Sequence, residues 1–213
     1  MNWQIKFALR NLQDNVKLNS IEHIRDDAIR IKLLDSSEVI VVISASYRIT
    51  EELVDQYRAD FPSMSFICGY RKECIWEGEA IKYAQENQIG WGNAGSLSDA
   101  IKSGDFINTE HKVYFFSYRL IRQMNSITNL DREYDRVFRM SLSNGKSYRV
   151  GMITDYEPTA DVIRTFWDQF GPIDIAWNIN PNRRPTQKAI IAGQELGCKV
   201  IKWDELKQLM RSS

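Results

Sequence analysis

The sequence lacks any long hydrophobic segment. Its longest apolar runs, such as Val39–Ile43, are far shorter than the roughly 20 residues that an α-helix needs to cross a bilayer. The residues after Met1 contain no basic segment that leads into a long apolar one, so we expect no signal peptide. These absences argue against a membrane-bound protein and favour a cytoplasmic one.

Cysteine and histidine are scarce. The three cysteines, Cys68, Cys74 and Cys198, are not spaced as metal ligands, and an odd number fits a reducing compartment better than a disulfide framework. The two histidines, His23 and His111, flank no serine or cysteine motif, and the sequence contains neither a glycine-rich phosphate loop nor a His-Glu-x-x-His zinc motif. We therefore expect no metal and no cofactor.

The chain also has no net charge, but its charges are unevenly divided. Residues 1–109 contain 12 Lys and Arg against 16 Asp and Glu, which is −4, and residues 110–213 contain 16 against 12, which is +4. The second half is therefore the one expected to meet an anionic partner. The opposite charges also favour a homo-oligomer, unless they reflect chance drift on two solvated surfaces.

The sequence does contain an internal repeat. A shift of 109 positions, the separation of Phe7 and Phe116, aligns the second half with the first without a gap. The identities include the following pairs: Arg10 and Arg119, Asp26 and Asp135, Arg30 and Arg139, Val41 and Val150, Tyr47 and Tyr156, Thr50 and Thr159, and Leu97 and Leu206. The repeat predicts a tandem duplication, with units over residues 1–104 and 110–213 joined by a short link.

Both units alternate strand-like and helix-like patterns. In the first unit we expect helices over 3–20, 50–60, 78–87 and 96–102, and strands over 28–33, 39–43, 65–68 and 89–91. In the second unit we expect helices over 113–127, 159–170, 186–196 and 203–211, and strands over 137–142, 148–153, 173–177 and 199–201. Strands joined through helices imply a mixed sheet covered by helices, so the predicted class is α/β with two mixed-sheet units.

The closing pattern of the second unit resembles a known family. It consists of Thr186, Ala189, Ala192, Gly197, Val200, Glu205, Leu206 and Leu209. This spacing resembles the C-terminal part of restriction-endonuclease-like domains of the Mrr type, over residues 135–211 and less clearly over 26–102. The resemblance implies the topology of that fold and a setting linked to DNA or to defence against foreign DNA.

The resemblance also implies where catalytic residues would lie. Such nucleases place an acidic residue on one hairpin strand and a carboxylate-x-lysine or glutamine-x-lysine on the next, which together hold a divalent metal and activate water. Asp26 and Asp135 lie near the first position, but neither second strand carries the second motif. We therefore expect pseudo-enzyme units. The alternative is a divergent Mg²⁺-dependent nuclease that uses Asp135 with Asp155 or Glu157, two carboxylates that otherwise suit a helix start.

The loop after the third predicted strand of the second unit is the main candidate for binding. It carries side chains of two kinds, three asparagines and three cations: Asn178, Asn180, Asn182, Arg183, Arg184 and Lys188. Asparagines both donate and accept hydrogen bonds, and cations at a helix start favour anions. Because open α/β folds bind ligands at the carboxyl ends of their strands, the loop predicts a phosphate or nucleic-acid contact. The alternative is a turn with solvated arginines.

The equivalent loop of the first unit has mixed charge and two aromatic residues. Arg71 and Lys72 follow Tyr70, and Trp76 lies further along the loop. If it is exposed, the aromatic pair suits a stacked base or a protein contact, and if it is buried it packs between units. We expect a non-catalytic binding or architectural protein that engages a protein or nucleic-acid partner through such loops.

Overall fold

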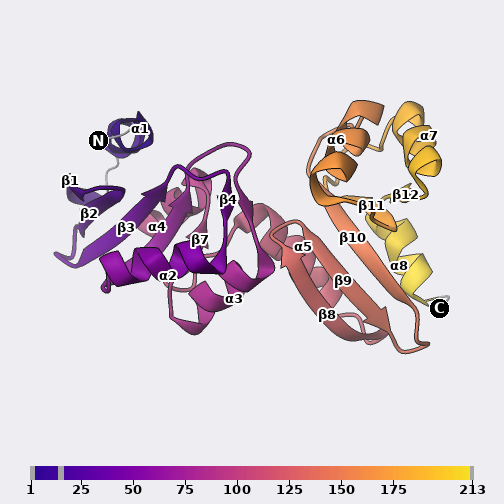
Figure 1. The fold of residues 1–213 in the computed structure, drawn as a ribbon, viewed down its shortest axis with the longest axis horizontal. Coiled ribbons are helices and arrows are strands. Elements are labelled where there is room, and N and C mark those ends of the chain that lie inside the picture. The colour runs from indigo at the N-terminus through magenta and orange to yellow at the C-terminus, as the bar shows by residue number, and fades with distance from the viewer. Residues whose placement is uncertain (1–2, 14–16, 212–213) are drawn as a thin grey trace. The chain divides into compact units, whose positions relative to one another are not determined.

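The computed structural model describes residues 3–13 and 17–211, which divide into two compact units, Met1–Lys112 and Val113–Ser213. Figure 1 shows the first unit in indigo to magenta and the second in pink through orange to yellow. Each unit has its own sheet, and the helices lie around it. Within the described ranges, every helix is too short or too polar to cross a membrane.

The first unit is built on a mixed five-stranded sheet. Its elements in chain order are α1 (Trp3–Leu12), β1 (Leu18–Arg25), β2 (Ala28–Leu33), β3 (Glu38–Ser44), β4 (Arg48–Ile49), α2 (Glu51–Asp60), β5 (Met64–Gly69), β6 (Ile75–Trp76), α3 (Gly78–Glu86), β7 (Gly90–Gly92) and α4 (Ala94–Ser103). The strand order is β1-β2-β3-β5-β7, with antiparallel pairs up to β3 and parallel pairs beyond it. Strands β4 and β6 form a separate parallel pair.

The second unit has the same architecture. Its elements are α5 (Lys112–Arg122), β8 (Ile127–Tyr134), β9 (Val137–Leu142), β10 (Ser147–Ile153), α6 (Ala160–Phe170), β11 (Ile175–Asn178), α7 (Gln187–Leu196), β12 (Lys199–Ile201) and α8 (Trp203–Arg211). Its sheet order is β8-β9-β10-β11-β12, again antiparallel up to β10 and parallel beyond it.

The two units correspond residue for residue over much of their length. The same shift of 109 positions places the bounds of β1, β2, β3 and β7 on those of β8, β9, β10 and β12. The structure therefore confirms an α/β protein with two similar mixed sheets. One difference has a direct cause: the positions of β4 and β6 fall on Glu157–Pro158 and Arg184–Pro185, and proline lacks the amide hydrogen that a strand pair needs.

Strands β1 and β8 were not predicted from the sequence, and the helices expected over 3–20 and 113–127 overlap them only at residues 18–20 and 127. The helices end at Leu12 and Arg122, and residues 14–16 lie outside the described ranges. The apolar residues Leu18, Ile21 and Ile24 are three apart, a helical spacing. Register shifts between residues 18 and 20 and between 23 and 25 produce this spacing in a strand, and β8 repeats both shifts at the equivalent positions.

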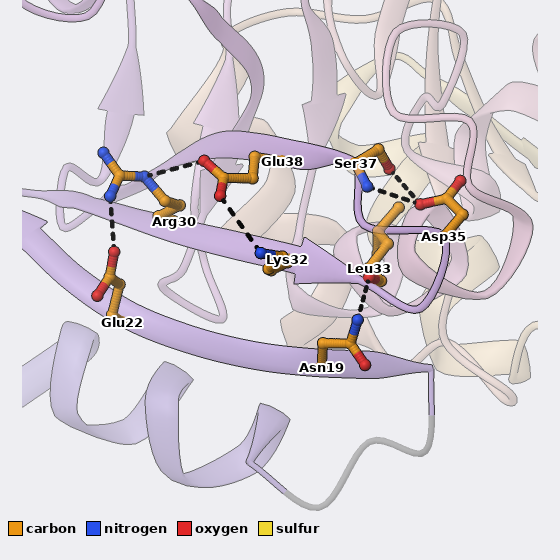
Figure 2. Close-up of polar contacts among 8 residues, drawn as sticks. All are labelled: Asn19, Glu22, Arg30, Lys32, Leu33, Asp35, Ser37 and Glu38. Atoms are coloured by element: carbon orange, nitrogen blue, oxygen red, sulfur yellow. Dashed lines mark hydrogen bonds and ion pairs between the residues drawn. The ribbon is translucent and has the colours of Figure 1, made fainter.

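The residue inside the first shift satisfies a carbonyl group of the neighbouring strand. In β1 the amide of Asn19 donates to the backbone oxygen of Leu33 at 2.9 Å, as Figure 2 shows. In β8 the hydroxyl of Thr128 donates to the backbone oxygen of Ser141 at 3.2 Å. Both units therefore keep the register shift together with a side chain that donates a hydrogen bond to the neighbouring strand.

Helices cover both faces of each sheet. In the first unit, α1 and α4 supply Ile5 and Leu97 to one core, and α2 and α3 supply Val54 and Ile81 to the other. In the second unit, α5 and α8 cover one face. The opposite face receives Phe166 of α6, and a Cβ atom on Gly151 would lie 2.3 Å from its ring. Glycine at position 151 therefore makes room for this phenylalanine.

Exposed charges line strands β1 to β3 away from the cores. Figure 2 shows Arg30 between Glu22 and Glu38, with nitrogen–oxygen distances of 2.7 and 3.7 Å, and Lys32 at 3.9 Å from Glu38. Exposed pairs of this kind contribute roughly 0–1 kcal/mol each. We therefore regard these ion pairs as part of a solvated surface and not as a binding site.

Candidate functional site

The candidate site of the second unit lies where three parallel strands end. Strands β10, β11 and β12 run parallel, so the loops that leave them meet at one edge of the sheet. Residues 154–159 follow β10, and residues 179–186, here called the binding loop, connect β11 to α7. Thr186 caps α7 by accepting a hydrogen bond from the amide of Ala189 at 3.1 Å.

Asn178, the last residue of β11, joins these segments from inside. Its side chain is buried, and its amide donates to the backbone oxygens of Asp155 at 2.8 Å and Ile153 at 3.4 Å. Its Oδ1 accepts a hydrogen bond from the Lys202 ammonium at 3.0 Å. Asn178 therefore supports the site from within and does not present a surface to a partner.

Lys202 holds the binding loop in one conformation. Besides Asn178, its ammonium donates to the backbone oxygen of Arg183 at 2.7 Å and to that of Asn180. Burial lowers the pKa of Lys202, the nearby charge of Arg184 lowers it further, and Glu205 acts in the opposite direction. Sequence analysis missed this residue, although its place just after β12, at the same edge of the sheet, was a signal.

The binding loop turns its cations outward. Asn182, Arg183, Arg184 and Lys188 are exposed, so four of the predicted binding residues are accessible. Asn180 is half-buried, and its Oδ1 accepts a hydrogen bond from the backbone amide of Asn182 at 3.1 Å. The loop therefore combines a fixed backbone with accessible positive charge.

Tyr156 completes this surface, and sequence analysis did not assign it. Its ring is 54% exposed. The Arg183 guanidinium lies over the ring, 5.5 Å from its centre, and its Nε donates to the Tyr156 hydroxyl at 3.2 Å. The sequence did offer a signal for Tyr156, since the repeat pairs it with Tyr47. Neither tyrosine is buried in a core, so packing does not explain this identity.

The first unit presents a matching pair. Tyr47 is 60% exposed, and the Arg71 guanidinium lies 4.0 Å from the centre of its ring. The Nε of Arg71 donates to the backbone oxygen of Ala45, and Lys72 beside it is exposed. The two arginines do not occupy equivalent positions of the repeat, yet each covers the equivalent tyrosine.

Trp76 belongs to the core of the first unit. It is 1% exposed, and its ring centre lies 5.2 Å from that of Trp91. It cannot reach a partner while this loop is folded, so we remove it from the set of binding residues that the sequence suggested.

The residues of the alternative nuclease site are arranged differently from a metal centre. Asp135 is fully buried, and its two oxygens accept hydrogen bonds from Arg136 Nε and Nη2, each at 2.8 Å. Asp155 and Glu157 are exposed. Among residues 3–13 and 17–211, no three His, Cys, Asp or Glu side chains are grouped as metal ligands. This geometry lends the nuclease alternative no support.

The carboxylates of Asp135 and Asp155 both influence the pKa of one buried phenol, that of Tyr114. Burial raises the pKa of Tyr114 to about 12, the nearby charge of Arg136 lowers it, and the carboxylates of Asp135 and Asp155 raise it. The buried Tyr114–Arg136–Asp135 group therefore lies near the Asp155 carboxylate, and Asp135 takes part in an internal ion pair rather than an open site.

Comparisons with known proteins found no matching family model, no matching curated sequence and no matching solved structure. The resemblance to restriction-endonuclease-like domains therefore stays a hypothesis.

Proposed function

We propose that this chain is a non-catalytic binding protein whose second unit engages a nucleic acid through the binding loop. The observation that carries the proposal is the contact of Lys202 with the backbone of that loop, which fixes it before any partner arrives. A loop that is ordered in advance loses less conformational entropy on binding.

The exposed groups of the loop suit a nucleic acid. Arg183 and Arg184 supply two cations that can contact phosphates, and Lys188 supplies a third at the start of α7. Tyr156 adds an exposed ring on which a base can stack. The net charge of +4 over residues 110–213 acts in the same direction.

The resemblance to restriction-endonuclease-like domains suggests a DNA-related setting, such as defence against foreign DNA. In that setting the buried Asp135–Arg136 pair would make the second unit a pseudo-enzyme, which binds without cutting. A protein with an acidic surface is the alternative partner for the same loop.

The experiment is a binding titration with labelled 20-nucleotide single and double strands at several salt concentrations. Arg183→Ala with Arg184→Ala should weaken binding at low salt at least about tenfold. For duplex DNA, the slope of the logarithm of the binding constant against the logarithm of the salt concentration should become less steep by about 0.9 for each lost phosphate contact. Both effects follow because each arginine that contacts a phosphate displaces counterions.

A matched control removes the same charge from a different element. Arg119 and Arg122 are exposed on α5, so Arg119→Ala with Arg122→Ala should leave the affinity within about twofold. Equal losses in both double variants would show that only net charge matters and would reject the loop as a site. If the wild type binds neither strand form, the nucleic-acid assignment fails, and binding to an acidic protein would replace it.

Self-association through the opposite charges of the two halves is a separate proposal. It predicts a dimer at low ionic strength that dissociates as salt is added, because charges on a surface are screened beyond about 10 Å at 0.1 M salt. Sedimentation at two salt concentrations tests it, and a monomer under both conditions would reject it.

A further inference from the structure

The first unit contains a pocket at a position where the second unit carries a tryptophan. Its volume is about 290 Å³, and it opens at the carboxyl end of β5. It is lined by the end of α1, by the residue after β5 and by the first turns of α4: Asn11, Leu12, Tyr70, Ala94, Gly95 and Leu97. Tyr70 and Asn11 are joined by a hydrogen bond of 3.2 Å, so both polar groups lie at the mouth of one pocket.

The repeat shows which side chain the equivalent position carries. The position of Ala94 is taken by Trp203 in the second unit, and the Trp203 ring centre lies 5.3 Å from that of Trp177. Trp203 packs in one cluster with Ile121, Ile179 and Leu206, the equivalents of Leu12, Tyr70 and Leu97. The equivalent positions therefore carry an indole packed on the core in one copy and a methyl group beside an open pocket in the other.

Helix α1, whose end lines the pocket, carries exposed aromatic and basic side chains. Trp3 and Phe7 are exposed on α1, with ring centres 6.2 Å apart, and the Phe7 ring centre lies 6.3 Å from that of Tyr70. Lys6 and Arg10 are also exposed on α1, and this helix contains no acidic residue. Exposed aromatic side chains beside arginine are typical of the central contacts in protein interfaces.

We propose that this pocket binds an aromatic side chain from an acidic segment of a partner protein. The indole of Trp203, at the position equivalent to Ala94 in the pocket wall, sets the size and shape of the anchor. Lys6 and Arg10 select acidic residues next to it. This site goes beyond the proposed nucleic-acid contact, which lies in the other unit.

Charge favours a peptide over a nucleic acid here. Residues 1–109 carry a net charge of −4, so a strand with a phosphate at every nucleotide would be repelled by the unit as a whole. A short acidic segment places its few charges against Lys6 and Arg10 alone. The balance therefore favours a local acidic contact over a polyanion.

The test uses two acetylated, amidated pentapeptides, Gly-Glu-Trp-Glu-Gly and Gly-Glu-Ala-Glu-Gly, whose two charges match Lys6 and Arg10, and the full chain labelled for NMR. We expect the tryptophan peptide to shift the amide signals of Gly95 and Ser98, with at least tenfold stronger binding than the alanine peptide. The variant Ala94→Trp should abolish these shifts and raise the melting temperature, because it fills the pocket. Ala59→Trp adds the same ring at an exposed position of α2 and should change neither.

A second variant keeps the test decisive if Ala94→Trp does not fold. Tyr70→Ala removes one wall of the pocket and should weaken binding of the tryptophan peptide at least tenfold. Lys6→Glu with Arg10→Glu should weaken it at least fivefold and improve binding of Gly-Lys-Trp-Lys-Gly. Retention of binding in both pocket variants would overturn the proposal.

Two further outcomes would assign the pocket to another occupant and so overturn the proposal. One is adenosine or a single-stranded oligonucleotide shifting Gly95 and Ser98 at lower concentration than the tryptophan peptide. The other is self-association of the wild type that Ala94→Trp abolishes. None of these results depends on Arg183 or Arg184, so the pocket and the binding loop succeed or fail independently.

Discussion

The ammonium group of Lys202 lies 3.0 Å from the side-chain oxygen of Asn178 and links the residue after β12 to the end of β11. This contact is the centre of the candidate site, because the same ammonium also bonds the backbone of the binding loop. Four predictions follow from this contact and from the buried groups of the second unit.

Replacing Lys202 with methionine should destabilise the protein by about 1–3 kcal/mol, because the buried Asn178 oxygen loses its donor. Urea denaturation measures the free energy of unfolding, and hydrogen exchange should rise in residues 179–186. Lys199→Met is the matched control, since Lys199 is exposed on β12, the strand that Lys202 follows. Equal stability of the two variants would contradict the role given to Lys202.

The charges around Lys202 should move its pKa in opposite directions. Arg184→Gln should raise the pKa, because it removes a repelling cation, and Glu205→Gln should lower it further. The folded pKa lies below the ordinary value of 10.5, so the folded chain releases this proton first. Its contribution to stability then increases as pH rises between the two values. An NMR titration of the lysine side chain checks both shifts.

Tyr114 should make the protein sensitive to alkaline pH. Its pKa is raised from 10.0 to about 12 by burial, so the unfolded chain ionises first and stability falls between these values. A shift of this size corresponds to about 2–3 kcal/mol. Tyr114→Phe should reduce the loss measured by denaturation at pH 9 and pH 12, whereas Tyr47→Phe, at an exposed ring, should not.

Asp135 should contribute to the stability of the fold and not to cleavage of nucleic acid. Asp135→Ala leaves Arg136 without its buried carboxylate, which we expect to cost about 3–5 kcal/mol. The wild type should leave DNA and RNA intact in the presence of Mg²⁺ or Mn²⁺. Cleavage by the wild type that a folded Asp135 variant loses would restore the nuclease alternative.

The sequence was most informative where the structure depends on neighbours along the chain. Thr50 and Thr159, where helices were expected to begin, accept hydrogen bonds from the amides of Leu53 and Val162 at 3.3 and 3.4 Å. The strands expected over 28–33, 39–43, 137–142 and 148–153 likewise form the hairpins β2–β3 and β9–β10. Such local patterns are visible in a single sequence.

The site was harder to predict because it depends on residues far apart in the chain. Lys202 meets Asn178 only because β12 lies beside β11, and no local pattern marks that contact. Whether Trp76 is buried or exposed became clear only from the structure of the first unit. Tyr156 is one of the identities of the repeat, but only the structure shows that its ring is exposed.

The register shifts in β1 and β8 also bear on how the protein behaves at high concentration. Each of these strands forms the outer edge of its sheet, and continuous pairing with the next strand is confined to residues 20–23 and 129–132. A long regular edge would offer unpaired amides and carbonyls to the edge of another molecule. The interrupted edges, preserved through the duplication, protect both units against aggregation by strand addition.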